Sequence, residues 1–157
     1  MKYDFNADDI FEMAEQLERN GANFYRNAAN SAEGEEQKQF LIRLADMEDD
    51  HEKTFQALRS DLTDPEKMST VFDPEGESVM YLKALADTRV FFEKEIDVTS
   101  MKEILKAAIE AEKDSIVFYL GMKEAVPEKM GKNRMDGIIK EEMGHIQLLA
   151  KELVKYK

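Results

Sequence analysis

The sequence predicts an all-α protein, and three observations support this fold class. The 157 residues include only 3 Pro and 7 Gly, the two residue types that most often interrupt helices. Apolar residues recur at spacings of three and four over most of the length. Good helix formers, namely Ala, Leu, Glu, Lys and Met, dominate the composition. The length is that of one ordinary domain, so we expect a single domain over residues 1–157.

The periodicity predicts four long helices. The first is expected from about residue 6 or 8 to residue 30, and the second over residues 35–61. The third is expected over residues 100–125, where Ser100 is a suitable N-cap and Glu103 follows three residues later.

The fourth helix is expected to follow Pro127 and to reach almost to Tyr156. Gly131 is a candidate break within this stretch, with a restart from Asn133.

A long connection of residues 62–98 separates the second helix from the third. It carries turn signals at Asp64-Pro65 and over residues 73–76, and residues 79–90 are expected to form a short extra helix. The other two connections are short, so the helices should pair as two antiparallel hairpins. A four-helix bundle of two hairpins joined by one long crossover is the ferritin-like arrangement.

Composition excludes several classes of function. The formal net charge of −12 leaves no basic surplus for nucleic acid or for an anionic membrane surface. The absence of Cys excludes disulfides, thiolate-bound metals and thiol nucleophiles. We find no signal peptide near residues 1–10 and no apolar run long enough to span a membrane, and we expect a cytoplasmic protein.

The two predicted hairpins are copies of one pattern. Glu18 and Glu112 are 94 residues apart, and each is followed by a Tyr seven residues later. Each hairpin then has a second helix with Glu-x-x-His. The same separation of 94 relates further pairs: Tyr25 and Tyr119, Glu48 and Glu142, His51 and His145. Such an internal repeat sets the architecture, because each copy supplies an equivalent half of the bundle.

The Glu and His members of this pattern occupy core positions. Glu48 and His51, for example, continue the apolar stripe that includes Leu44 and Phe55, with steps of three and four. Within each hairpin the two glutamates are equidistant from the expected turn, so they should face each other at mid-bundle. Buried carboxylates gathered in this way would repel one another and lose their hydration.

Two divalent metal ions would resolve this conflict, because their charge cancels that of four carboxylates. Two helices each offering a Glu, and two offering Glu-x-x-His, match the pattern of di-iron and di-manganese bundles. We therefore expect two Fe ions, with Mn or Zn as alternatives. The competing interpretation is a set of core polar residues satisfied by hydrogen bonds. The predicted ligands are Glu18, Glu48, His51, Glu112, Glu142 and His145.

Two open questions concern neighbours of these residues. Tyr25 and Tyr119 are either core aromatics with satisfied hydroxyls or supports for a ligand carboxylate, and a redox role is a further alternative. Asp49, Glu110 and Glu141 flank the predicted ligands, and a supporting role for any of them stays open.

The segments that carry these residues resemble the rubrerythrin-like branch of the ferritin-like superfamily. The resemblance spans the whole chain and includes all six ligand positions. It implies a di-iron centre that reacts with peroxide or dioxygen, in a protein that is often a homodimer. The segments are Leu17–Tyr25 (LERNGANFY), Met47–His51 (MEDDH), Glu112–Tyr119 (EKDSIVFY) and Glu141–His145 (EEMGH).

Two features depart from that family's pattern. Rubrerythrin itself carries a rubredoxin-like domain whose iron is held by four cysteines, whereas this sequence has no Cys. An external, rubredoxin-like electron carrier would therefore be needed. Rubrerythrins also carry an extra carboxylate one turn after the third-helix ligand, and here that position is Ser115.

Three hypotheses for function follow. The leading one is an oxidoreductase that reduces peroxide or dioxygen at the two metals. The second is iron handling, by ferroxidation and then transfer or storage. The third is a metal-stabilised structural or signalling module without turnover.

Overall fold

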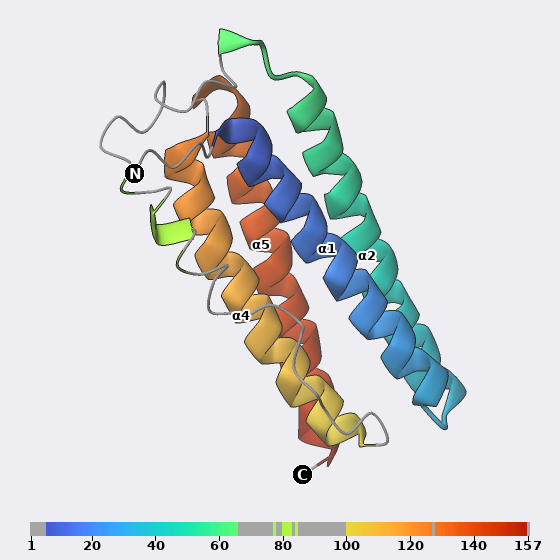
Figure 1. Ribbon diagram of the computed structural model, residues 1–157. Helices are drawn as coiled ribbons and strands as arrows, with labels where there is room; N and C mark the ends of the chain where they lie inside the picture. The colour runs from blue at the N-terminus through green and yellow to red at the C-terminus, as the bar shows by residue number, and fades with distance from the viewer. Residues whose placement is uncertain are drawn as a thin grey trace.

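A computed structural model describes residues 6–65, 77, 80–82, 84, 100–126 and 128–156, with the backbone alone for 128–133. Within this part of the chain the fold is all-helical, as predicted. The long helices are α1 (Ala7–Ser31), α2 (Glu35–Ser60), α4 (Met101–Ala125) and α5 (Glu128–Leu153), followed by the short 3-10 helix η2 (Val154–Tyr156) (Figure 1).

Side-chain caps explain where two of the helices begin. The Asn6 side chain accepts a hydrogen bond from the Asp9 N–H at 2.9 Å, and the Asp9 carboxylate accepts one from the Asn6 N–H at 3.1 Å. Ser100 accepts a hydrogen bond from the Glu103 N–H at 3.3 Å, as the sequence predicted. These bonds satisfy backbone donors that have no partner inside the helix.

The prediction of a break near Gly131 was wrong. Gly131 and Asn133 both lie inside α5, which is continuous from Glu128 to Leu153. A glycine inside a helix costs only about 1 kcal/mol relative to alanine, and the long helix tolerates that cost.

The expected extra helix at 79–90 falls mostly outside the described residues. Within it, the four described residues, 80–82 and 84, are helical. Leu82 is fully buried in the core, and the Tyr81 ring lies against Gly121 of α4. A Cβ at Gly121 would lie 2.6 Å from the Tyr81 ring, so only glycine permits this close approach.

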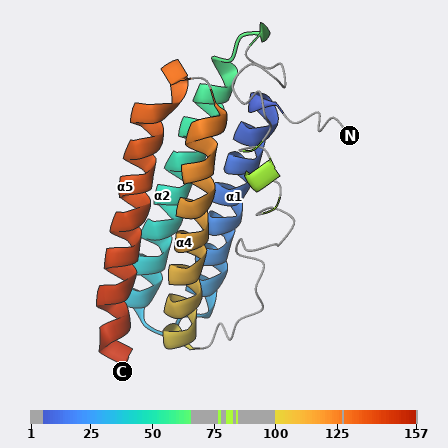
Figure 2. The same cartoon turned by 90° about the vertical axis from the view of Figure 1, so that its left-hand side faces the viewer.

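The four long helices form the two predicted hairpins. α1 packs mainly against α2, and α4 mainly against α5, while fewer contacts join one hairpin to the other. Figure 2 shows the four helices running alongside one another. No helix in the described part of the chain combines the length and apolar character that a bilayer crossing requires.

Two apolar clusters fill the bundle and leave a layer between them. The first joins the start of α1 to the end of α2 and includes Phe11 and Phe55. The second joins the end of α1 to the start of α2 and includes Tyr25 and Leu41. Residues that lie between these clusters along each helix are therefore enclosed by apolar side chains from both directions.

Candidate metal centre

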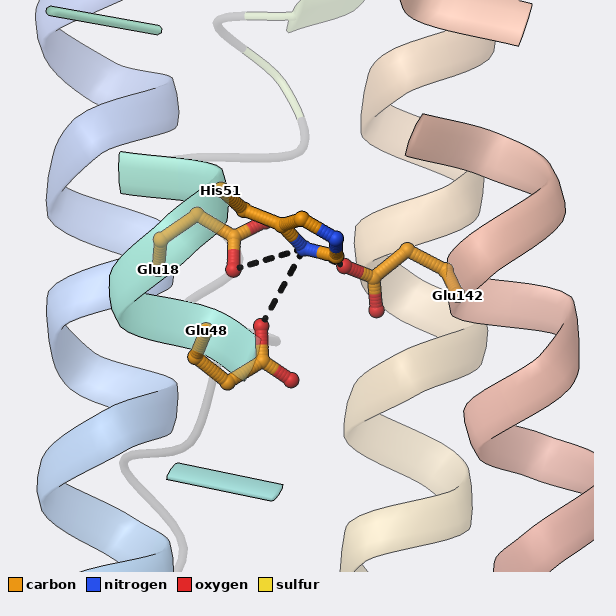
Figure 3. Close-up of side chains that lie close together, drawn as sticks. All are labelled: Glu18, Glu48, His51 and Glu142. Atoms are coloured by element: carbon orange, nitrogen blue, oxygen red, sulfur yellow. Dashed lines mark ion pairs between the residues drawn. The ribbon is translucent and has the colours of Figure 1, made fainter. Parts of the chain in front are cut away.

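The layer between the clusters contains all six predicted ligands. α1 supplies one glutamate, α4 another, and α2 and α5 each supply a Glu-x-x-His pair. Every one of the six residues is buried, with no more than 4 % of its surface exposed. Figure 3 shows how four of them converge from three helices. The six are Glu18, Glu48, His51, Glu112, Glu142 and His145.

Their ligand atoms form two overlapping groups. In each group, one atom from every residue lies within 4.8 Å of the others. Glu48 and Glu142 belong to both groups, so each could contribute to holding either ion. The first group adds Glu18 and His51, and the second adds Glu112 and His145.

Both imidazoles turn Nδ1 towards the carboxylates. His51 Nδ1 lies 2.8 Å from Glu142 Oε1 and 3.5 Å from Glu18 Oε2. His145 Nδ1 lies 3.4 Å from Glu48 Oε1, 3.5 Å from Glu112 Oε1 and 3.6 Å from Glu142 Oε2. The two rings are stacked, with centroids 5.6 Å apart.

The donor set fits a pair of metal ions. Buried polar atoms are normally hydrogen-bonded, yet among the described residues six buried atoms of this cluster have no hydrogen-bond partner. Two imidazole nitrogens and four carboxylate oxygens are the donors that iron, manganese or zinc prefers. The six atoms are Glu18 Oε2, Glu48 Oε1, Glu142 Oε1, Glu142 Oε2, His51 Nδ1 and His145 Nδ1.

The carboxylates influence one another's protonation. Burial, together with the charges of neighbouring glutamates, raises the pKa of Glu48 and of Glu142 well above the usual value. Burial also acts to raise the pKa of Glu112, but the nearby Glu142 carboxyl and His145 imidazole outweigh burial and lower that pKa to about 2.

Burial acts to lower the pKa of each histidine, but neighbouring carboxylates raise both values. Burial acts to lower the pKa of His51, but the Glu142 and Glu18 carboxylates outweigh it and raise the pKa to about 11. In the same way Glu112 and Glu142 raise the pKa of His145 to about 9. Protons therefore balance part of the carboxylate charge in the metal-free protein, and a metal ion would displace them.

Tyr25 and Tyr119 support the cluster crosswise. The Tyr25 hydroxyl on α1 donates to Glu112 Oε1 on α4 at 2.7 Å, and the Tyr119 hydroxyl on α4 donates to Glu18 Oε1 on α1. Burial and nearby carboxylates raise the pKa of both phenols well above the usual value. Both tyrosines therefore stay protonated and orient a carboxylate of the opposite hairpin.

Replacing either tyrosine by Phe should weaken metal binding at one position. Loss of such a supporting hydrogen bond typically lowers metal affinity about 10-fold or more. We expect Tyr25→Phe to affect the Glu112 position and Tyr119→Phe the Glu18 position, as measured by zinc competition with a chromophoric chelator. Tyr156→Phe is the control, because that hydroxyl contacts Gln37, at 3.2 Å, rather than the cluster. Unchanged affinity in both variants would mean that the hydroxyls only satisfy the core.

Ser115 does not supply the extra ligand. It is buried, but its Oγ donates to the Ala111 carbonyl oxygen of the preceding turn at 3.1 Å. A serine hydroxyl engaged with its own helix is a poor substitute for a carboxylate.

Of the three acidic residues that flank the ligands, one contacts a ligand side chain in the structure. Asp49 pairs with Arg26, and Glu110 pairs with Lys113. Glu141 pairs with Nε2 of His51, the nitrogen that faces away from the cluster. The sequence pattern could not separate these three, because all of them lie next to or near a ligand on a polar helix face.

A cleft of about 710 Å³ lies between α2 and α5, beside both histidines. Sequence reasoning did not predict it, since it depends on how the two hairpins pack. It offers a path from solvent towards the outer edges of the imidazoles. Its lining residues are Met47, Asp50, His51, Thr54, Glu141, Gly144, His145, Gln147, Leu148 and Lys151.

Fold and site together define a ferritin-like helical bundle with a buried carboxylate–histidine cluster that could bind metal. The rubrerythrin family model matches residues 9–153, and the chain belongs to the rubrerythrin family. Among solved structures, a Thermotoga maritima protein assigned as a ferritin-like diiron-carboxylate protein is similar, with a TM-score of 0.71 and 24% identity over 100% of both chains. That likeness bears on the fold. Among curated proteins, none matches this sequence.

Proposed function

We propose that this protein binds two iron ions at the six-residue cluster and reduces peroxide or dioxygen there. The observation that carries the proposal is the set of six buried ligand atoms without hydrogen-bond partners among the described residues. Such an arrangement is costly in a metal-free core and is typical of a metal site. The similar Thermotoga protein, assigned as a diiron-carboxylate protein, supports the choice of iron.

The two groups of ligand atoms define which residues would hold each ion. Glu18 and His51 belong to one position, Glu112 and His145 to the other, and Glu48 and Glu142 to both. When bound, two Fe(II) ions would supply Lewis acidity and two electrons, which with two protons suffice to reduce one peroxide to two waters or one dioxygen to peroxide.

The chain's own residues prepare this environment. Tyr25 and Tyr119 hold Glu112 and Glu18 in position through hydrogen bonds. The apolar clusters on either side of the layer exclude water, which strengthens each electrostatic interaction within it. The cleft between α2 and α5 provides access for a small oxidant.

Electrons for repeated turnover would come from a separate carrier. The sequence contains no Cys, so it cannot form the four-cysteine iron centre of a rubredoxin-like donor. We propose a rubredoxin-like protein as the external reductant.

Iron handling is the second candidate, and Ser115 is the observation that favours it. Its hydroxyl is bonded to the Ala111 carbonyl, so the position that carries an extra carboxylate in rubrerythrins offers none here. A site with fewer ligands would release oxidised iron more easily. Ferritin-type storage further requires a shell of subunits, so the mass by size exclusion would separate it from a homodimer.

A peroxide titration tests the oxidoreductase proposal. We expect anaerobic protein loaded with Fe(II) to be oxidised rapidly by about one equivalent of peroxide, because two Fe(II) carry the two electrons that one peroxide needs. Cycling should stay slow until a rubredoxin-like carrier is added. Absorbance after rapid mixing and peroxide consumption measure the two stages, and Ser115→Glu should change the reactivity towards peroxide.

Two outcomes would overturn this proposal. If the loaded protein reacted with neither peroxide nor dioxygen over minutes, a structural or signalling module would be the better description. If dioxygen oxidised the iron and the iron then left the site, iron handling would replace peroxide or dioxygen reduction as the function.

A further inference from the structure

The two histidines of the cluster differ in what their outer nitrogens meet. His51 directs Nδ1 at the carboxylates, and its Nε2 contacts the carboxylate of Glu141. Glu141 immediately precedes the ligand Glu142 in α5, and 63% of its side-chain surface is exposed. An exposed carboxylate that reaches a buried imidazole is a specific contact rather than part of the core.

The internal repeat places no carboxylate at the equivalent position beside His145. With the separation of 94 residues, the counterpart of Glu141 is Met47, which immediately precedes Glu48. The ion pairs of His145 within the described part of the chain all involve Nδ1. A thioether is only a weak acceptor and carries no charge, so Met47 cannot replace a carboxylate.

A carboxylate behind a metal-binding imidazole strengthens it as a ligand. It accepts the proton of the outer nitrogen, fixes the tautomer that leaves the inner nitrogen free, and raises the basicity of the ring. Loss of such a partner typically lowers metal affinity 10- to 100-fold. When a metal ion replaces the proton on Nδ1, the contact of Glu141 with Nε2 therefore favours the His51 tautomer that keeps its proton on Nε2 and leaves Nδ1 free to bind.

We propose that the two metal positions are unequal, and that Glu141 is the positioning residue that makes the His51 position fill first and hold its ion more tightly. This inference rests on the proposed two-metal site. The two positions also differ in geometry, since the nearest carboxylate oxygen is 2.8 Å from His51 Nδ1 and 3.4 Å from His145 Nδ1.

The asymmetry extends along the cleft. Both imidazoles line it, as do Glu141 and Met47, so the two positions open onto one space with different surroundings. Because both positions share this access, the proposed difference in affinity decides the order of exchange, and the ion at the His145 position exchanges with solution first.

Histidine NMR during a zinc titration tests this order. The chain has only 2 His, so metal-free protein labelled with ¹⁵N-histidine gives one set of ring signals for each, and His145→Gln identifies which set is which. Zinc is diamagnetic and accepts the same carboxylate and imidazole donors. Below one equivalent of zinc, we expect the His51 signals to change to a metal-bound Nδ1 with a protonated Nε2, while the His145 signals lag.

Variants at the paired positions test the cause. Glu141→Gln should weaken the tighter step about 10-fold and reduce the lag between the two histidines. Met47→Glu should tighten the weaker step. The double variant Glu141→Met with Met47→Glu should reverse the order. Glu110→Gln is the matched control, because it removes one exposed carboxylate that pairs with Lys113 rather than with a histidine.

The outcomes separate this inference from the proposed function. If both histidines bound zinc together in the original protein and in Glu141→Gln, the inequality would be refuted while the two-metal site stood. If His145 filled first in the original protein, Glu141 would not be the determinant. If neither histidine responded to zinc or to Fe(II), the proposed function itself would fail.

Discussion

Replacing Glu142 by Ala is expected to abolish the binding of both metal ions, whereas replacing His145 should cost one. The protein loaded with Fe(II) should carry about two ions per chain. Glu142 and Glu48 have ligand atoms in both groups, while His145 and Glu112 belong to one group. Loss of a carboxylate that belongs to both groups would remove a donor from both positions.

Metal analysis after anaerobic loading and desalting measures this difference. We expect Glu142→Ala and Glu48→Ala to retain well below one ion, and His145→Ala and Glu112→Ala to retain about one. Glu110→Ala, which removes an exposed carboxylate outside the cluster, should retain the full amount. One ion per chain in the original protein, unchanged in His145→Ala and Glu112→Ala, would rule out the two-metal site.

The ligand positions were predictable because burial of a charged side chain leaves a periodic signature. Glu48 and His51 interrupt an apolar stripe, and the repeat places Glu142 and His145 at the matching positions. The structure confirms the fold class and brings all six side chains together, but their binding of metal stays a prediction.

The partners of the tyrosines were not predictable in the same way. Tyr25 lies two helical turns, about 10 Å, from Glu18 on its own helix. Its hydroxyl nevertheless reaches Glu112 on the opposite hairpin. A linear repeat reveals that Tyr25 and Tyr119 are equivalent, but the packing of one hairpin on the other decides which carboxylate each one meets.

The role of Glu141 was also not predictable from the sequence. It lies on an exposed helix face, where an acidic residue is ordinary and periodicity carries no information. Its contact with His51 depends on the lateral placement of α5 against α2. In the sequence, the one signal that singles out Glu141 is that the equivalent repeat position holds Met47. That difference can be interpreted only when the contact of Glu141 with His51 is known.

The stability of the metal-free protein is expected to fall as pH rises from about 6 to about 9, while that of the loaded protein stays nearly level. The folded-state pKa values of His51 and His145 are raised to about 11 and about 9. Their stabilisation is therefore complete below the unfolded value near 6.5 and is lost as pH rises through about 9 and then about 11.

The carboxylates change the stability of the metal-free protein with pH in both directions. The raised pKa values of Glu48 and Glu142 mean that stability falls as pH rises above the unfolded carboxylate value. The lowered pKa of Glu112 gives a contribution that is present above about pH 4.5 and lost towards about pH 2. Between pH 6 and pH 9 the sum is negative, on the order of 1 kcal/mol per pH unit for each extra proton that the folded state holds.

Bound metal should remove the dependence of stability on pH, because the ion takes the place of the protons that the metal-free cluster holds. Above about pH 6.5 the imidazoles are neutral both in the loaded folded state and in the unfolded chain, so no proton is taken up or released by them on unfolding and the stability of the loaded protein has little slope with pH. Thermal melts with Mn(II) and with a chelator should therefore diverge as pH rises. A metal-free melting temperature that climbed steadily from about pH 6 to about pH 9 would contradict the clustering of these groups.

Glu48→Gln is the variant that isolates the cluster as the cause, since it removes one buried charge and keeps the shape of the side chain. In the metal-free protein it removes a carboxyl that burial, and then repulsion from Glu18, Glu142 and Glu112, makes costly to keep either charged or protonated, so the free energy of unfolding at pH 8 should rise by about 1–3 kcal/mol. For a chain of this size each 1 kcal/mol raises Tm by about 2–4 °C. With Mn(II) the sign should reverse, because the same substitution removes a shared ligand and with it the stabilisation that binding provides.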